Sequence, residues 1–356
     1  MKCAIITITG TTNYGNVLQI LALQTVLEKL SAEAAAIKSP FQPKASAYQK
    51  LKSTVKNILG RGDKLRKKRI KEFSSFNSKY IKFDDFKNAG SYDYFVCGSD
   101  QIWNPRLVGG HLDYYFASFA PQSKRVAFSA SIGINSIDES LHNKFSTNIK
   151  QMKSISVREE TAAELIKDLT GTEVCVTVDP TLMLSKDEWM NFAEKPSFAK
   201  SKRFILTYFI GTSSPEVKEY VSKVAKEANC EIINLQSEWQ NDNEIENKEQ
   251  FCAVPSEFIW LAANCEAFFT DSFHGSCFSI IMRKPFRYFT RYEKDKSDTT
   301  SRMSNLFDRL KISEWCIGST QEKAEHIFFS DYSEVTQIIE REKAAAFNYL
   351  KNALSN

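Results

Sequence analysis

The sequence has 356 residues, of which 42% are hydrophobic and 12% aromatic, enough apolar material for two packed domains of ordinary size. Its 47 Lys and Arg residues against 43 Asp and Glu give a formal net charge of +4, which excludes a chain that binds nucleic acid through its overall charge. The eight cysteines stand singly, with neither a CxxC pair nor metal-ligand spacing, so we expect reduced thiols, no metal site and a cytoplasmic protein.

The first half of the chain is a series of strand, turn and helix units. KCAIITI at 2–8 predicts a buried strand, GTTNYGN at 10–16 a turn, and VLQILALQTVLEKL at 17–30 a helix exposed on no more than one narrow face. Further strands with polar turns are predicted within 92–100, 124–133, 155–169 and 174–184. Because each strand leads into polar residues, we expect a binding site along the carboxyl edge of an open parallel sheet.

The second half repeats this pattern after a change in composition. Residues 186–202 are polar, lysine-rich and contain Pro196, which predicts an inter-domain linker. Strands resume within 203–211, 230–235, 265–270 and 283–290. We therefore predict an α/β protein with two Rossmann-like doubly wound domains. Residues 1–185 form the first, as the acceptor side, residues 203–330 form the second, and 331–356 form a C-terminal helix.

One interval departs from this pattern. Residues 52–71, KSTVKNILGRGDKLRKKRIK, hold nine basic residues against Asp63 alone. Two interpretations stay open. The interval is either a solvated helix face or a patch that meets an anionic surface, such as membrane headgroups or a diphosphate-linked acceptor. No stretch of the sequence reaches the ~18 apolar residues of a membrane span, so contact with a membrane is expected to be peripheral.

The stretch TDSFHGSCF at 270–278 places a histidine between two apolar runs. CEAFFT predicts a buried strand, and Asp271 or Ser272 is a suitable N-cap for the helix that follows. His274 then lies in the first helical turn, where free amides favour an anion, and Gly275 lets a ligand approach the backbone. A histidine at a helix start is often a capping or packing residue, but the carboxyl edge of a parallel sheet favours a function.

Several stretches now resemble those of one family, the polysaccharide pyruvyl transferases, and occur in that family's order. They are NYGNVLQILALQ at 13–24, FVCGSDQIWNP at 95–105, FSASIG at 128–133, SVREE at 156–160, VDPTLML at 178–184, and TDSFHG at 270–275. The resemblance implies a fold similar to B-type glycosyltransferases, with the active cleft between two domains. It also implies that phosphoenolpyruvate gives its enolpyruvyl unit to a sugar diol of a capsule or exopolysaccharide precursor, leaving a pyruvate ketal and phosphate.

The resemblance implies roles for residues in these motifs. His274 transfers a proton, and an anionic donor bound beside it favours the imidazolium. Arg158 binds the phosphate or carboxylate of phosphoenolpyruvate, as do Ser272, Gly275 and Ser276. An ion pair of Arg158 with a neighbouring glutamate is the structural alternative. No cofactor is expected beyond phosphoenolpyruvate as donor substrate.

Further candidates for binding acceptor or donor are turn residues. They are Asn13, Gly15, Asn16, Asp100, Gln101, Asp179 and Arg302. Each is also suited to a cap or turn, and Arg302 with Arg291 flanks a polar loop. The implied acceptor is a lipid-linked oligosaccharide at the inner face of the plasma membrane.

Two other functions remain open. One is a nucleotide-sugar glycosyltransferase of the same fold, but such enzymes commonly present a carboxylate to the ribose from the helix after this strand, and residues 275–289 contain no Asp or Glu. The other is a non-catalytic sugar-binding relative, against which the intact DSFHG stands.

Overall fold

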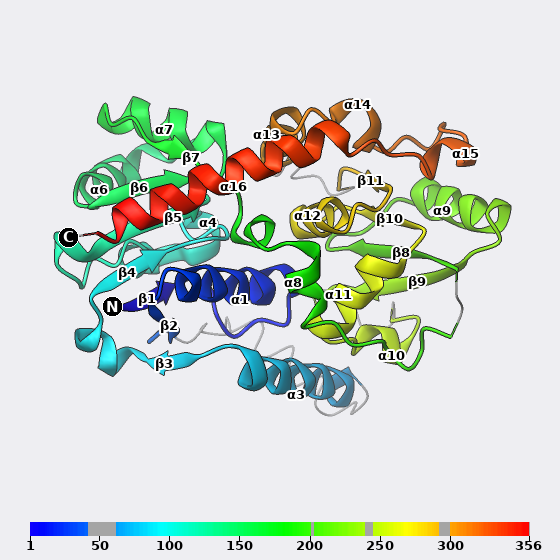
Figure 1. Ribbon diagram of the computed structural model, residues 1–356, viewed down its shortest axis with the longest axis horizontal. Helices are drawn as coiled ribbons and strands as arrows, with labels where there is room; N and C mark the ends of the chain where they lie inside the picture. The colour runs from blue at the N-terminus through cyan, green and yellow to red at the C-terminus, as the bar shows by residue number, and fades with distance from the viewer. Residues whose placement is uncertain (42–61, 201–202, 239–244, 292–299, 356) are drawn as a thin grey trace.

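Two parallel β-sheets lie side by side in the computed structural model, which describes residues 1–41, 62–200, 203–238, 245–291 and 300–355 (Figure 1). The larger sheet has seven strands in the order β3-β2-β1-β4-β5-β6-β7, and the smaller has four in the order β11-β10-β8-β9. Neighbouring strands pair in parallel throughout both sheets. The predicted fold class of two Rossmann-like units is confirmed.

The first sheet carries helices on both faces, so its central strands are covered on both sides. Its strands are β1 (Lys2–Ile6), β2 (Glu33–Lys38), β3 (Phe83–Asp85), β4 (Tyr94–Cys97), β5 (Arg125–Ala130), β6 (Ser154–Val157) and β7 (Cys175–Val176). Its helices are α1 (Tyr14–Lys29), α3 (Gly62–Tyr80), α4 (Pro105–Val108), α5 (Leu112–Tyr115), α6 (Glu139–Lys150) and α7 (Glu160–Thr170), with the short η4 (Pro180–Met183). Strands β4 and β5 are buried at every position, as strands covered on both faces are.

The second sheet is built in the same way. Its strands are β8 (Phe204–Phe209), β9 (Glu231–Gln236), β10 (Ala267–Thr270) and β11 (Phe286–Tyr288). Its helices are α9 (Pro215–Glu227), α10 (Lys248–Phe251), α11 (Pro255–Asn264), α12 (Phe273–Met282), α13 (Thr300–Arg309), α14 (Ser313–Cys316) and α15 (Ala324–Ile327).

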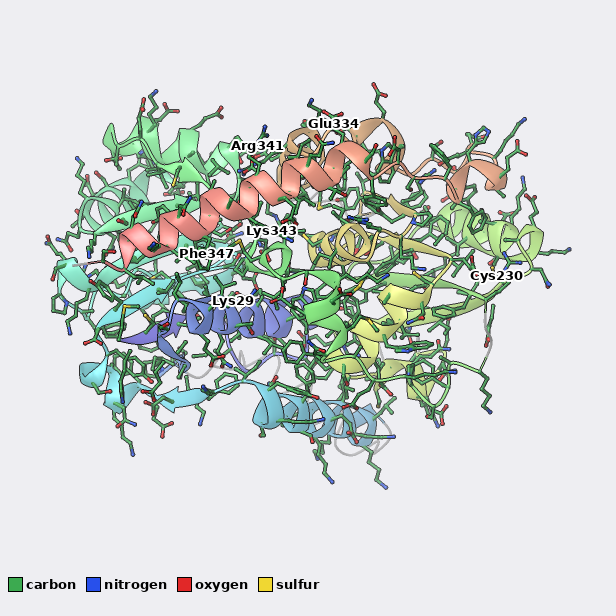
Figure 2. The ribbon with its side chains drawn as sticks, in the orientation of Figure 1. Lys29, Cys230, Glu334, Arg341, Lys343 and Phe347 are labelled. Carbon is green, nitrogen blue, oxygen red and sulfur yellow. The ribbon has the colours of Figure 1, made fainter. Side chains whose placement is uncertain are left out.

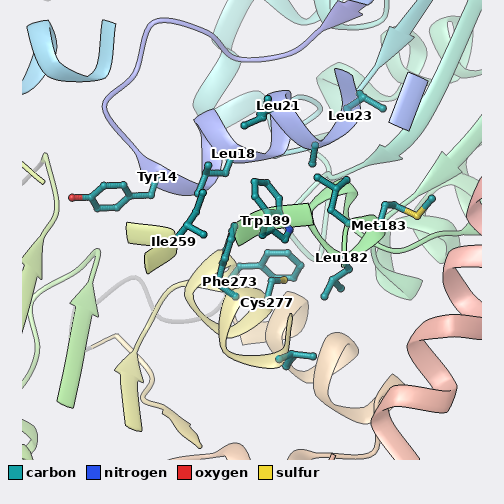
Figure 3. Packing of buried hydrophobic residues seen from close by; sticks show 14 of the residues in the cluster. Tyr14, Leu18, Leu21, Leu23, Leu182, Met183, Trp189, Ile259, Phe273 and Cys277 are labelled. Atoms are coloured by element: carbon teal, nitrogen blue, oxygen red, sulfur yellow. The ribbon is translucent and has the colours of Figure 1, made fainter. Parts of the chain in front are cut away.

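The two halves share one hydrophobic core. Helix α1 is buried from Tyr14 to Gln24, in agreement with its predicted lack of a broad exposed face. Its side chains, including Leu18, meet Trp189 from α8 (Lys186–Met190) and Cys277 from α12 in one cluster (Figure 3). Because this cluster contains residues of both sheets, separating the halves would expose apolar surface.

Two segments outside the sheets also join the halves. The stretch predicted as a linker, 186–202, contains α8, whose Trp189 is fully buried and donates from Nε1 to the Thr181 carbonyl at 3.0 Å. The last helix, α16 (Ser333–Ala353), spans both halves (Figure 1). Near its start the Tyr332 hydroxyl donates to the Lys284 carbonyl at 2.6 Å, and near its end the Tyr349 hydroxyl donates to the Ala127 carbonyl of β5 at 2.8 Å. The predicted domain limits stay a prediction.

The outer face of α16 is polar. Figure 2 labels Glu334 and Arg341 along this helix, and both side chains are largely exposed. No helix in the described ranges is both long enough and apolar enough to cross a membrane.

The basic interval is only partly described, because residues 52–61 lie outside the described ranges. The rest of the interval, residues 62–71, forms the start of α3. Arg69 is buried there, whereas both interpretations require it to face solvent. The Arg69 guanidinium donates to the carbonyls of Gln236 at 3.1 Å and Thr12 at 2.9 Å, and lies 5.2 Å from the Tyr14 ring centroid. These partners come from both halves, so Arg69 helps to hold the two halves together. Its assignment to the surface patch is wrong.

Candidate active site

One side of the site lies at the carboxyl edge of the first sheet, where the connections between strands change direction. Strands β1 and β4 are neighbours, but the chain continues from β1 to β2 on one side and from β4 to β5 on the other. Such a switch point leaves a crevice outside the carboxyl ends of the strands, where open α/β sheets bind ligands. The turns after β1 and β4 are joined there, because Asn16 Nδ2 donates to Asp100 Oδ2 at 3.0 Å. Two predicted site residues therefore lie side by side.

His274 enters the same region from the second half. It lies in the first turn of α12, whose N-cap Ser272 accepts through Oγ from the Gly275 amide at 3.2 Å. The imidazole is buried, with Nε2 3.6 Å from Asp179 Oδ2. That distance is too long for a hydrogen bond but short enough for the carboxylate to attract a protonated ring. The ring packs against the start of α1, since a Cβ on Gly15 would lie 2.1 Å from Nδ1.

Arg158 follows β6 and is held in place by carboxylates. Its Nη1 donates to Asp179 Oδ2 at 2.8 Å, and its Nε lies 3.6 Å from Glu159 Oε2. The guanidinium carbon is 4.1 Å from the ring centroid of Phe273, the residue before His274. Both oxygens of the Asp179 carboxylate accept hydrogen bonds, because Oδ1 accepts from the amide and hydroxyl of Thr181. Arg158, Asp179 and His274 therefore form one buried cluster.

The cluster is electrostatically coupled. Burial by itself would raise the pKa of Asp179, but the neighbouring His274 and Arg158 outweigh burial and hold this pKa well below its ordinary value. For Arg158, burial acts to lower the pKa, yet the carboxylates of Glu159 and Asp179 raise it above its ordinary value. The Asp179 carboxylate is thus ionised in the folded protein and orients Arg158.

A second arginine lies close by, from α13. Arg302 is buried, and burial followed by repulsion from Arg158 lowers its pKa to about 10. Arg158, Glu159, Phe273 and Arg302 line a small cavity between the halves, with a volume of about 20 Å³, which is room for about one water molecule. The two guanidinium groups therefore line one narrow cleft.

Several polar atoms in and beside this cleft lack hydrogen-bond partners among the described residues. They are Arg158 Nε and Nη2, Arg302 Nε, His274 Nε2 and Glu159 Oε2. Most buried polar groups in folded proteins are paired, so such a concentration at one place indicates a ligand site. Most of these atoms are nitrogens on groups that carry or can gain positive charge, which suits an anion. Within the described ranges, no group of three or more His, Cys, Asp or Glu side chains could hold a metal ion.

The other predicted site residues have structural contacts. Asn13 caps α1 by accepting from the Asn16 amide at 3.2 Å, and Gln101 accepts through Oε1 from Asn104 Nδ2 at 3.0 Å. Ser276 donates to the Ser272 carbonyl at 3.2 Å.

Two expectations about small and acidic residues are changed by these contacts. A Cβ on Gly275 would lie 2.5 Å from Thr270 Oγ1, so this glycine permits close packing rather than the approach of a ligand, and Gly15 is the glycine that faces His274. Asp179, predicted to accept from a sugar, has its side chain fully buried and bound to protein groups. It positions Arg158 instead.

Sequence reasoning did not assign a site role to Glu159 or Phe273. Glu159 was considered only as an ion-pair partner of Arg158, yet its Oε1 also accepts from the Ser131 hydroxyl and the Gly133 amide of the FSASIG stretch. Phe273 stands inside the DSFHG stretch and supplies the ring beneath Arg158. Glu159 is next to Arg158 in the chain, and Phe273 is next to His274. This adjacency is the feature of the sequence that could have identified both residues.

Comparison with known proteins gives a family and a fold. A family model described as polysaccharide pyruvyl transferase matches residues 13–292. No curated protein matches the sequence. In fold, the chain is similar to a UDP-N-acetylglucosamine 2-epimerase from Listeria monocytogenes, with a TM-score of 0.50 and 10% identity over 99% of this chain and 91% of that one.

Two more solved structures are similar at lower scores. The S. aureus MnaA protein in a structure with UDP has a TM-score of 0.47 and 13% identity over 95% of this chain and 90% of that one. E. coli ADP-heptose LPS heptosyltransferase II has a TM-score of 0.39 and 12% identity over 96% and 99%.

Proposed function

The chain belongs to the polysaccharide pyruvyl transferase family, and from this we propose that it transfers the enolpyruvyl group of phosphoenolpyruvate to a sugar diol of a capsule or exopolysaccharide precursor. The products are a pyruvate ketal and inorganic phosphate. The observation that carries the proposal is the set of unpartnered polar atoms on Arg158, Arg302 and His274.

Phosphoenolpyruvate suits these groups because it has two anionic ends. A guanidinium binds phosphate or carboxylate through two parallel N–H bonds, and Arg158 has both Nε and Nη2 available for this. Arg302, from the opposite wall, binds the other anionic group. The cavity of about 20 Å³ is smaller than this donor, so binding separates the α13 side of the cleft from the side formed by β6 and η4.

The reaction needs one proton donor at carbon and loses two hydroxyl protons. His274 gives a proton to the methylene carbon of the enol phosphate, which makes the neighbouring carbon electrophilic. A sugar hydroxyl attacks that carbon, phosphate leaves, and the second hydroxyl closes the ketal. One hydroxyl proton returns to His274 and the other leaves with phosphate, so the enzyme is restored. The Asp179 carboxylate, 3.6 Å from Nε2, stabilises the protonated ring during this cycle.

The partners are those that the family resemblance implies. Phosphoenolpyruvate is the donor substrate and no further cofactor takes part. The acceptor is a lipid-linked oligosaccharide, met by a cytoplasmic enzyme at the inner face of the plasma membrane, and no nucleic acid is involved. The exposed lysines of α3, Lys64, Lys68 and Lys71, make the peripheral contact.

The test is release of inorganic phosphate from phosphoenolpyruvate in the presence of a panel of lipid-linked and soluble glycosides, with mass spectrometry of the glycan. We expect phosphate release that depends on the glycoside and a glycan mass increase that matches a pyruvate ketal. Transfer of sugar from a nucleotide sugar, with no phosphate from phosphoenolpyruvate, would establish the glycosyltransferase alternative. Glycoside binding without either reaction would establish a non-catalytic relative.

A further inference from the structure

A second cavity lies at the carboxyl edge of the smaller sheet. Strands β8 and β10 are neighbours, but β8 connects to β9 on one side and β10 to β11 on the other, so this sheet also has a switch point. A cavity of about 190 Å³ opens there, and its lining includes Thr212, Ser213, Tyr288 and Phe289. It is larger than the cleft at Arg158 and belongs entirely to the second half.

The charges of this cavity are paired. Asp271 is buried and accepts through Oδ1 from the Ile210 amide at 2.6 Å and through Oδ2 from the Gly211 amide at 2.8 Å. The Nε of Arg291, the other charged residue of the lining, lies 3.3 Å from the same carboxylate. The cavity therefore carries no net charge among its described lining residues.

The helix that starts at this cavity does not favour an anion. The N-cap Ser214 of α9 accepts from the Val217 amide at 3.3 Å, which occupies one of the amides at the helix start. Glu216 adds a negative charge in the first turn. A phosphate group would meet that charge, whereas hydroxyl groups can pair with the Thr212 and Ser213 side chains.

The cavity adjoins the active cleft. Asp271 lines the cavity and Phe273 lines the cleft, and two residues of chain span at most about 7 Å between their Cα atoms. His274 is the next residue. A molecule seated in the cavity thus lies beside the segment that carries the proton-transfer histidine.

We propose that this cavity is the subsite for a neutral pyranose ring of the acceptor. The hydroxyl groups of Thr212 and Ser213 bind sugar hydroxyls, and the apolar face of the ring lies against Phe289 and Ile317 of the lining. This inference rests on the proposed function and deepens it. It also moves the sugar from the first half, which the sequence led us to expect as the acceptor side, to the second.

The test measures sugar binding independently of turnover. Methyl glycosides of common hexoses and N-acetylhexosamines are screened for binding to the full chain by saturation-transfer NMR, and the dissociation constant of the best binder is measured. Ser213→Trp fills the cavity, so the dissociation constant should rise by about 10-fold or more, while phosphoenolpyruvate affinity stays within about twofold. Glu219→Trp, which places the same new side chain on the exposed face of α9, should change neither.

A second variant tests the same cavity with a smaller risk of misfolding. Thr212→Val with Ser213→Ala removes both hydroxyl groups without adding bulk, and should weaken sugar binding by about 5-fold or more. Unchanged sugar affinity in both cavity variants, or absence of glycoside binding to the unmodified protein, overturns the subsite. Binding of UDP that Ser213→Trp abolishes also overturns it and assigns a nucleotide site. Glycoside binding lost in the variants, together with no phosphate release by the unmodified protein, upholds the subsite and refutes the pyruvyl transfer.

Discussion

Arg158 combines a fixed orientation with unused hydrogen-bonding capacity. One nitrogen is bound by Asp179 at 2.8 Å, while Nε and Nη2 have no hydrogen-bond partner among the described residues. Arg158→Lys keeps the charge beside Asp179 but removes the planar pair of donors. We expect KM for phosphoenolpyruvate to rise by about 10-fold or more, because charge-assisted hydrogen bonds are lost, with the acceptor KM unchanged. Steady-state kinetics with each substrate varied in turn measures this. An equal rise in both KM values contradicts the assignment.

His274 is the residue assigned to proton transfer. His274→Gln keeps a polar side chain of similar size but cannot exchange a proton near neutral pH. We expect kcat to fall by about 10²- to 10⁴-fold with phosphoenolpyruvate affinity kept within about threefold. Phosphate-release rates and calorimetric titration of the donor give the two quantities. Activity within about threefold of the unmodified enzyme would assign His274 to packing alone.

Asp179 links the site to the stability of the fold. Its pKa is held below the ordinary value, so it contributes stability that is fully present above its unfolded pKa of about 3.9 and is lost as pH falls toward the folded pKa. Asp179→Asn removes the closer of the two carboxylates that neutralise buried Arg158, which costs up to about 3–5 kcal/mol of unfolding free energy at neutral pH. Denaturant unfolding at several pH values should show a steeper loss below about pH 4 for the unmodified protein than for the variant. Parallel curves would show that Asp179 is not the titrating group.

Helix α1 brings its first turn against the histidine ring, and Gly15 makes this possible. A Cβ at this position would lie 2.1 Å from His274 Nδ1, so Gly15→Ala must displace the ring. Alanine stabilises a helix relative to glycine by about 1 kcal/mol, which partly offsets the displacement in the free energy of unfolding. We expect kcat to fall by about 10-fold or more, with the unfolding free energy changed by about 1 kcal/mol or less.

A matched control exists for this substitution. A Cβ on Gly90 would meet nothing within 4 Å, and Gly90→Ala should leave kcat unchanged. Full activity of Gly15→Ala, measured by phosphate release, would show that the contact between α1 and the ring does not matter for turnover.

A peripheral contact of the protein with anionic lipid depends on the exposed lysines of α3. Lys64, Lys68 and Lys71 are exposed, while Arg69 is buried between the two halves. Each basic residue at an anionic surface contributes about 1 kcal/mol, so changing the three lysines to Gln should weaken binding to phosphatidylserine vesicles by about 100-fold at low salt. Vesicle sedimentation measures the effect, and rising salt should weaken binding of the unmodified protein.

The control for this experiment is an equal change of charge elsewhere. Lys218, Lys223 and Lys226 are exposed on α9, and changing them to Gln should leave vesicle binding unaltered. Equal loss in both triple variants means that net charge, and not the α3 face, governs binding. Arg69→Gln, by contrast, should lower the unfolding free energy, because it removes donors that reach both halves.

Sequence patterns predicted nine of the eleven described strands, helices α1, α12 and α16, and the two-sheet architecture, but neither β2 (Glu33–Lys38) nor β3 (Phe83–Asp85). Apolar runs such as Phe204–Phe209 alternate with polar turns and helices, and this local pattern is enough to predict buried parallel strands. The motif around His274 also predicted a helix start at the carboxyl edge of a strand, because capping residues act within one turn of the chain. The sequence did not predict α8, which lies inside the predicted linker 186–202.

The tertiary structure decides which charged residues meet. Arg158 and Asp179 follow the neighbouring strands β6 and β7 of the first sheet, whereas His274 reaches them because the two sheets pack around α1 and α12. The same packing turned Asp179 from a candidate ligand residue into a buried partner of Arg158. It also buries Arg69, one residue of a basic run, between the two halves, because backbone carbonyls and aromatic rings from both halves surround its guanidinium. Charge in a sequence reveals how many ionic groups exist, whereas burial and distance decide which of them interact.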